Sequence, residues 1–268
     1  MKITISNPTV LIEDTFTTDD FDMFHTMTHI DGVDYTFARN IKNQQWITST
    51  IKIDNQIIGL GEDPRAFDLM GMPACYSVRF NEWERFVPQL YFKAGDEWSN
   101  IQISMSGGLA PGKNWGPFVY NEEIYFVHEV SPFRVVKLVG DTVETVFVKD
   151  IPCELHQIDR YPVLRSGSNG LEVKPGVILG FGHDNYALST SVLSLRHRPF
   201  AWILDMNKQD VEIQYMDFEW DEKYQIIDAS AFFIKDGQYY LMASEGETNQ
   251  AKRDQSYRSC LYPISITD

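Results

Sequence analysis

Hydrophobic and polar residues alternate in short runs along most of this chain, and almost no stretch has the 3.6-residue period of a helix. The runs are rich in Val, Ile, Tyr, Phe and Trp, and each ends at Gly, Asn, Asp or Pro, which is typical of strands. They cover residues 45–53, 74–80, 100–105, 123–129, 134–139, 142–149, 177–182, 201–205, 231–234 and 238–243. The pattern predicts an all-β protein.

Two short polar segments between these runs, 121–123 and 235–238, have the composition of hairpin turns. One helical turn is expected near residues 17–24, because the sequence Thr-Thr-Asp-Asp at its start can cap a short helix.

A coarser unit also recurs, in which a polar segment leads into a strand, a tight turn and a second strand that ends in an aromatic residue between apolar ones. The units centre on residues 35–55, 63–105, 115–150, 165–205 and 228–265. Units of this size match four-stranded propeller blades. The sequence therefore predicts one domain over residues 1–268, a five-bladed β-propeller with a central substrate pocket. A two-sheet sandwich is the alternative, and in the propeller the strand at 2–6 is expected to complete the last blade.

Composition narrows the possible partners. The formal net charge of −15 argues against a nucleic-acid backbone or an anionic membrane as the main partner. No apolar run approaches the ~20 residues that span a bilayer. Cys75, Cys153 and Cys260 have no metal-ligand spacing, so we interpret them as reduced, buried thiols of a cytoplasmic protein.

The strongest chemical signal is the turn Gly59-Leu60-Gly61-Glu62-Asp63-Pro64-Arg65. It places two carboxylates and a guanidinium on a short segment that Pro64 stiffens, which suits a carboxylate aimed into a cavity. A capped turn with a surface ion pair is the alternative. Polar segments beside Gly or Pro also open the other units, at residues 35–40, 112–118, 165–169 and 180–184. Together these segments offer arginines, a lysine, a histidine and aromatic faces, the groups that bind sugars and phosphates.

In this order, the motifs Glu62-Asp63-Pro64-Arg65, Lys113-Asn114-Trp115-Gly116-Pro117-Phe118, Arg165-Ser166-Gly167-Ser168 and Gly180-Phe181-Gly182-His183 resemble those of glycoside hydrolase family 130. That family consists of five-bladed propellers, among them β-mannoside phosphorylases and hydrolases, and related mannosyltransferases share the architecture. The resemblance covers residues from about 35 to 250. The chain departs from the family at 167–170, where a Pro-Pro pair is usual, and at 244–247, where a Gly-Ala-Ala-Asp type motif is usual.

The resemblance implies roles for single residues. Asp63 corresponds to the catalytic carboxylate, which acts as an acid in phosphorolysis and as a base in transfer to an acceptor. Trp115 or Phe118 is expected to stack on a sugar, and His183 and Arg165 are expected near a phosphate. The full set of expected substrate-binding residues is Arg39, Asn40, Glu62, Arg65, Lys113, Asn114, Trp115, Arg165, His183 and Asp184. No metal ligand is expected, and His25, His29, His128, His156 and His197 have no metal spacing.

The predicted function is inverting glycosyl transfer on a small-molecule or oligosaccharide substrate, with phosphate or a sugar nucleotide as co-substrate and no other cofactor. Three alternatives stay open. An inverting glycoside hydrolase needs a second carboxylate, for which Glu62, Asp184, Glu245 and Glu247 are candidates. The others are a non-catalytic carbohydrate-binding propeller and a propeller that serves as a protein-interaction scaffold.

Overall fold

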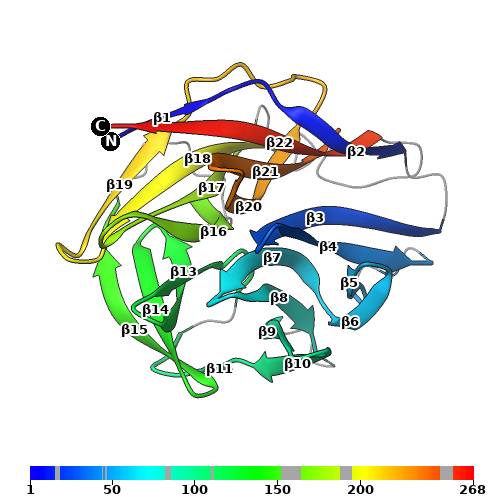
Figure 1. The fold of residues 1–268 in the computed structure, drawn as a ribbon, viewed down its shortest axis with the longest axis horizontal. Coiled ribbons are helices and arrows are strands. Elements are labelled where there is room, and N and C mark those ends of the chain that lie inside the picture. Colours follow the sequence, from blue (N-terminus) through cyan, green and yellow to red (C-terminus); the bar gives the residue numbers. More distant parts are fainter. Residues whose placement is uncertain are drawn as a thin grey trace.

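The computed structural model describes residues 1–15, 19–43, 45, 47–81, 86–109, 112–151, 164–187, 195–247 and 256–268. Within these ranges all regular elements are strands, and there is no helix with the length and apolar character needed to cross a membrane. The strands form five blades around one axis, each built on four antiparallel strands, and a parallel bridge from His197 to Ile226 joins the last two blades into one nine-stranded sheet (Figure 1). The predicted five-bladed β-propeller is confirmed.

The chain builds the blades in order, and the first strand of each blade is the innermost. Blade one contains β3 (Asp20–Ile30), β4 (Val33–Lys42), β5 (Thr50–Ile53) and β6 (Gln56–Leu60). Blade two contains β7 (Glu62–Leu69), β8 (Met72–Phe80), β9 (Phe86–Ala94) and β10 (Glu97–Gln102). Blade three contains β12 (Gly116–Tyr120), β13 (Glu123–Val130), β14 (Phe133–Val139) and β15 (Thr142–Lys149), with the short β11 (Ser104–Met105) parallel to β15 at its outer edge. Blade four contains β16 (Leu164–Lys174), β17 (Val177–Ala187), β18 (Leu195–Asp205) and β19 (Asp210–Tyr215).

The fifth blade is made from both ends of the chain. Its inner three strands are β20 (Ile226–Lys235), β21 (Gln238–Gly246) and β22 (Ser256–Thr267). The outer edge of β22 pairs with β1 (Lys2–Ile5) and β2 (Thr9–Thr15), which lie end to end along it. The two termini therefore lie together (Figure 1). This pairing confirms the prediction that the N-terminal strand completes the last blade.

The two predicted hairpin turns are confirmed. Asn121 and Glu122 connect β12 to β13, and Asp236 and Gly237 connect β20 to β21, all four with positive φ as a type I′ turn requires. The helical turn predicted at 17–24 is wrong from residue 20 onward, where β3 begins. Polar and apolar residues alternate there, so the period is that of a strand; residues 17 and 18 lie outside the described ranges.

The blades pack face to face through large apolar side chains. Trp202 of blade four contacts Phe118 and Phe133 of blade three, and it is fully buried. The ring lies so close to β17 that a Cβ atom added to Gly180 would be 2.2 Å from Trp202 Cζ2. Glycine at position 180 is therefore required by a close approach between neighbouring strands.

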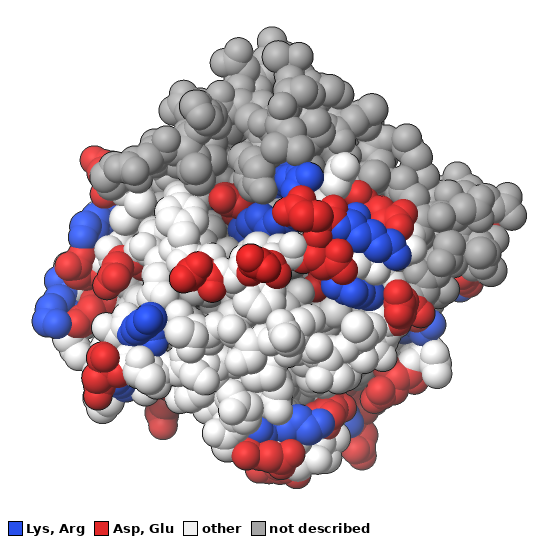
Figure 2. Space-filling view, turned by 90° about the horizontal axis from the view of Figure 1, so that it is seen from above, with Lys and Arg blue, Asp and Glu red and all other residues white. Residues whose placement is uncertain are grey.

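Cys75 and Cys260 are buried and free, as expected, and Cys153 lies outside the described residues. Acidic side chains are spread across the face of the molecule in Figure 2 and are mixed with lysines and arginines. The negative net charge of the chain thus does not form one continuous acidic surface on this face.

Candidate active site

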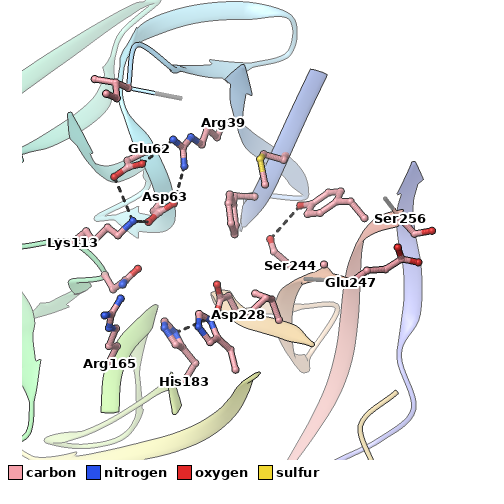
Figure 3. Close-up of a pocket in the computed structure, with 18 of the residues that line it drawn as sticks. Arg39, Glu62, Asp63, Lys113, Arg165, His183, Asp228, Ser244, Glu247 and Ser256 are labelled. Carbon is pink, nitrogen blue, oxygen red and sulfur yellow. Dashed lines mark hydrogen bonds and ion pairs between the residues drawn. The ribbon is translucent and has the colours of Figure 1, made fainter. Parts of the chain in front are cut away.

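The inner ends of blades one, two, four and five and the segment that precedes blade three enclose a cavity of about 400 Å³ (Figure 3). The residues that line it are Met23, Phe24, Arg39, Ile47, Glu62, Asp63, Phe80, Lys113, Asn114, Arg165, His183, His197, Ile226, Asp228, Ser244, Gly246, Glu247, Ser256 and Tyr257. Residues far apart in the sequence meet here because the blades surround one axis.

A β-bulge at the start of β7 directs Asp63 into this cavity. The pairing of β7 with β8 shifts register between Glu62 and Arg65, and Asp63 has a φ of +51°. A left-handed conformation is uncommon for a residue other than glycine, and such outliers cluster at functional sites. Glu62 and Asp63 are both buried at the cavity wall.

Two cations bridge this pair of carboxylates. Nη2 of Arg39 lies 2.8 Å from Oε2 of Glu62, and its Nη1 lies 3.4 Å from Oδ1 of Asp63. Nζ of Lys113 lies 3.5 Å from Oε1 of Glu62 and 3.4 Å from Oδ2 of Asp63. Ser49 accepts a hydrogen bond from Nε of Arg39 at 3.0 Å and fixes the guanidinium. The two negative charges are therefore compensated inside the protein.

The two carboxyl groups have pKa values shifted in opposite directions. Burial, and then the charge of Asp63, raise the pKa of Glu62, although Arg39 and Lys113 oppose the rise. Burial would also raise the pKa of Asp63, but Lys113, Arg39 and Arg65 outweigh it and lower this pKa below its ordinary value. Asp63 is thus the carboxylate kept ionised, and neighbouring carboxyls with divergent pKa values are typical of acid–base sites.

A second polar cluster occupies another side of the cavity and joins blades four and five (Figure 3). Nδ1 of His197 lies 2.7 Å from Oδ1 of Asp228, and Nδ1 of His183 lies 3.5 Å from the same oxygen. The two imidazole rings stack with centroids 4.8 Å apart. Burial lowers the pKa of His183 to about 3, so this ring is neutral. Burial alone would raise the pKa of Asp228, but the two histidines and Arg65 lower it well below its ordinary value.

One ligand atom each from His183, His197 and Asp228 lies within 4.8 Å of the others. Two imidazoles and a carboxylate form a donor set that suits a transition metal. The hydrogen bond between His197 and Asp228 and the ring stacking account for the proximity without a metal. Arg65 and Arg165 also place positive charge next to His183, which disfavours a bound cation.

Seven of the residues expected at the site line the cavity: Arg39, Glu62, Asp63, Lys113, Asn114, Arg165 and His183. Four do not: Asn40, Arg65, Trp115 and Asp184. Asn40 and Asp184 each follow a cavity residue along a strand, and successive side chains of a strand point to opposite faces. Asn40 donates to Asp20 and Asp22, and Asp184 accepts from the backbone N–H of Arg198.

Trp115 and Arg65 support the site from behind. Trp115 is fully buried and stacks on Tyr76 at 5.5 Å, so a sugar in the cavity does not reach its ring. Phe118 is likewise fully buried. Nη2 of Arg65 donates to Oδ1 of Asn114 at 3.0 Å, which links the turn of the catalytic candidate to the segment that carries Lys113.

The residues that sequence reasoning missed are mainly Phe24, His197, Asp228 and Tyr257. No local motif marks them, and Phe24 lies in the segment for which the sequence predicted a helical turn. Of the carboxylates considered for hydrolysis, Glu247 lines the cavity, whereas Glu245 is buried elsewhere and accepts hydrogen bonds from Arg258 and Tyr262.

No protein-family model matches the sequence, and no curated protein matches it significantly. Solved structures do match the fold. One belongs to the GH130 family of mannoside phosphorylases, which is described as containing glycoside hydrolases that target β-1,2 mannosidic linkages in Candida mannan. The two structures align with a TM-score of 0.64 and 10% sequence identity, and the alignment covers 92% of this chain and 85% of that chain. The mannose phosphorylase MPT-4 from Leishmania mexicana has a TM-score of 0.55 at 11% identity, over 94% and 88%.

A third match is a thermostable family-43 glycoside hydrolase, with a TM-score of 0.60 at 9% identity over 99% of this chain and 94% of that one. At these identities the similarity shows the fold alone. These structural neighbours are all carbohydrate-active enzymes, and they include both phosphorylases and hydrolases.

Proposed function

We propose that this protein is an inverting glycosyl-transfer enzyme and that Asp63 is the residue that moves the proton. The observation that carries the proposal is the buried Glu62–Asp63 pair, bridged by Arg39 and Lys113 at the wall of a central propeller cavity. The lowered pKa of Asp63 keeps this carboxylate ionised, which a general base requires before it accepts a proton. In synthesis, the Asp63 carboxylate takes the proton of the acceptor hydroxyl as its oxygen attacks the anomeric carbon and the bond to the leaving group breaks.

The leaving group in this scheme is a phosphate or a nucleoside diphosphate, and the basic side of the cavity would bind it. Arg165 on β16 is the register partner of His183 on β17, and both line the cavity. Lys113 adds a second cationic group beside Arg165. Phosphorolysis is the same reaction reversed, with protonated Asp63 giving its proton to the glycosidic oxygen while phosphate attacks.

Inverting hydrolysis is the second candidate function, and the position of Asp228 in the cavity favours it. Asp228 lies close enough to Asp63 across the cavity to oppose the lowering of its pKa. A hydrolase uses such a second carboxylate to activate water. Asp228 is also already engaged with two histidines, which would have to release it for this role.

Phosphorus NMR on mixtures of sugar nucleotides, sugar-1-phosphates and short acceptor glycans tests the proposal. Wild-type protein should release inorganic phosphate or nucleoside diphosphate, and Asp63→Asn should abolish the release. Asp54→Asn, an equivalent change in an exposed turn, is the matched control and should behave as wild type. Release of free sugar from a β-mannoside without phosphate would instead favour hydrolysis, and no turnover of any substrate would overturn the proposal.

A further inference from the structure

Blades one and two carry the same irregularity in their inner strands. The pairing of β3 with β4 shifts register between Met23 and Thr26, as that of β7 with β8 shifts between Glu62 and Arg65. In each bulge the residue after the first paired position has a positive φ, +48° at Phe24 and +51° at Asp63. Phe24 therefore occupies in blade one the position that Asp63 occupies in blade two, and both residues line the cavity.

A left-handed conformation is unfavourable for a bulky aromatic residue, so the surrounding structure must impose it. The next residue provides the restraint. The backbone N–H of His25 donates to the hydroxyl oxygen of Tyr257 at 3.1 Å, and its carbonyl accepts from Oγ of Ser244 at 3.4 Å. Nδ1 of His25 lies 3.2 Å from Oγ of Ser259. These contacts connect the bulge of blade one to two strands of blade five and hold Phe24 in place.

The cavity wall combines apolar and charged side chains. Its apolar lining includes Met23, Phe24, Ile47, Phe80 and Tyr257, and its charged lining includes the Arg39–Glu62–Asp63–Lys113 group. Phe24 is partly exposed, unlike the fully buried Trp115 and Phe118. A pyranose ring has the same two characters, with hydroxyls around its edge and C–H groups on its face. The negative face of an aromatic ring attracts such C–H groups.

We propose that Phe24 is the stacking platform for the sugar ring whose hydroxyls face the Arg39–Glu62–Asp63–Lys113 group. The ligand class is a pyranoside, bound with its C–H face on the phenyl ring. The proposal rests on the carbohydrate-directed function argued above, but it concerns binding and not turnover. It replaces Trp115 in the role that the sequence indicated for an aromatic residue.

Binding of methyl pyranosides with the manno, gluco and galacto configurations, followed by saturation-transfer and titration NMR, tests the platform. Phe24→Tyr keeps the aromatic face and should bind as wild type does. Phe24→Leu keeps an apolar side chain without that face, and should weaken binding of the preferred sugar by tenfold or more, as should Phe24→Ala. Equal dissociation constants for wild type and Phe24→Leu would overturn the proposal, with thermal melting used to confirm that the variants are folded.

The outcomes separate this proposal from the function. Sugar binding that depends on Phe24, without turnover of any donor, leaves the platform standing and overturns glycosyl transfer. Turnover that depends on Asp63, with a KM unaffected by Phe24→Leu, supports glycosyl transfer and overturns the platform. Absence of binding by wild type to every pyranoside, at concentrations up to the solubility limit, overturns the platform, whereas the function is decided by turnover.

Discussion

His197 and Asp228 form a hydrogen-bonded pair across the boundary of blades four and five, with Nδ1 and Oδ1 2.7 Å apart. The hydrogen bond holds the imidazole ring of His197, which lines the cavity, in one orientation. Hydrogen-bonded carboxylates set the tautomer and direction of histidines in many enzymes.

Asp228→Asn is expected to reduce kcat/KM by about 10- to 100-fold, because a hydrogen bond to a charged group contributes about 1.5–3 kcal/mol. Steady-state kinetics on the substrate found by phosphorus NMR measures the change. Asp210→Asn, which alters an exposed carboxylate on the outer strand of blade four, is the control. Unchanged kcat/KM in Asp228→Asn would show that the pair is structural only.

Lys113→Met is expected to shift the acid limb of the pH–rate profile. Lys113 is the strongest of the three charges that lower the pKa of Asp63, so its removal raises that pKa. If ionised Asp63 is the base, kcat/KM then starts to fall at a higher pH than in wild type as the solution is acidified. The profile of Lys137→Met, which removes a surface ion pair with Glu123, should match that of wild type. An acid limb at the same pH in Lys113→Met would contradict the assignment of Asp63.

The stability of the fold is expected to decrease below about pH 6.5. Burial lowers the pKa of His25 to about 4 and of His183 to about 3, whereas an unfolded histidine has a pKa of about 6.5. Below pH 6.5 the unfolded chain binds more protons at these sites than the folded one, so the free energy of unfolding falls with pH, by up to ~1.4 kcal/mol per pH unit for each histidine. At pH values well above 6.5 both states are neutral at these sites, and they contribute no slope.

Urea denaturation at pH 7.5, 6.0 and 5.0 measures this dependence. His25→Gln removes one of the two titrating histidines. Between pH 6.5 and 5 the two histidines together make the free energy of unfolding depend on pH, and the variant should lose about half of that dependence. An unaltered slope would mean that the folded and unfolded states bind protons equally at His25, which would contradict its lowered pKa.

Gly180→Ala is expected to destabilise the protein by about 1–3 kcal/mol, the usual cost of overpacking a core. The added Cβ would lie 2.2 Å from the Trp202 ring, which is itself packed between two blades. Gly112→Ala is the matched control, since its Cβ would approach nothing closer than 3.8 Å. Equal unfolding free energies for the two variants would contradict the close approach.

The fold could be predicted from the sequence because its signals are local. Alternation within runs defined the strands, and the recurring polar entrances defined five blades. The part of the site on blade two and before blade three could also be predicted, since Glu62, Asp63 and Lys113 lie in short segments of unusual composition beside Gly or Pro, although Glu62 and Asp63 belong to β7 and not to a turn. The role of Asp228 could not be predicted from the sequence, because this residue follows Ile226 and Ile227 in a run typical of a buried strand. Only the closure of the propeller ring places Asp228 near Asp63.

The sequence also did not predict which side chains point into the cavity. The sequence gives no register for a strand that begins at a turn, so Trp115 and Asn114 were both assigned to the cavity although only Asn114 faces it. The bulge that turns Phe24 inward also has no sequence signature, because its positive φ is imposed by hydrogen bonds to residues of the last blade.

The joining of both chain ends in blade five determines when the protein can finish folding during its synthesis. β1 and β2 have no partner until β22 has left the ribosome, and His25 precedes its partner Tyr257 by 232 positions. Pairings of such long sequence separation are slow to form, since the intervening chain must be ordered first. A nascent chain with four complete blades thus still lacks Asp228, Ser244 and Tyr257 at its centre, and the wall of the cavity stays incomplete until blade five has formed.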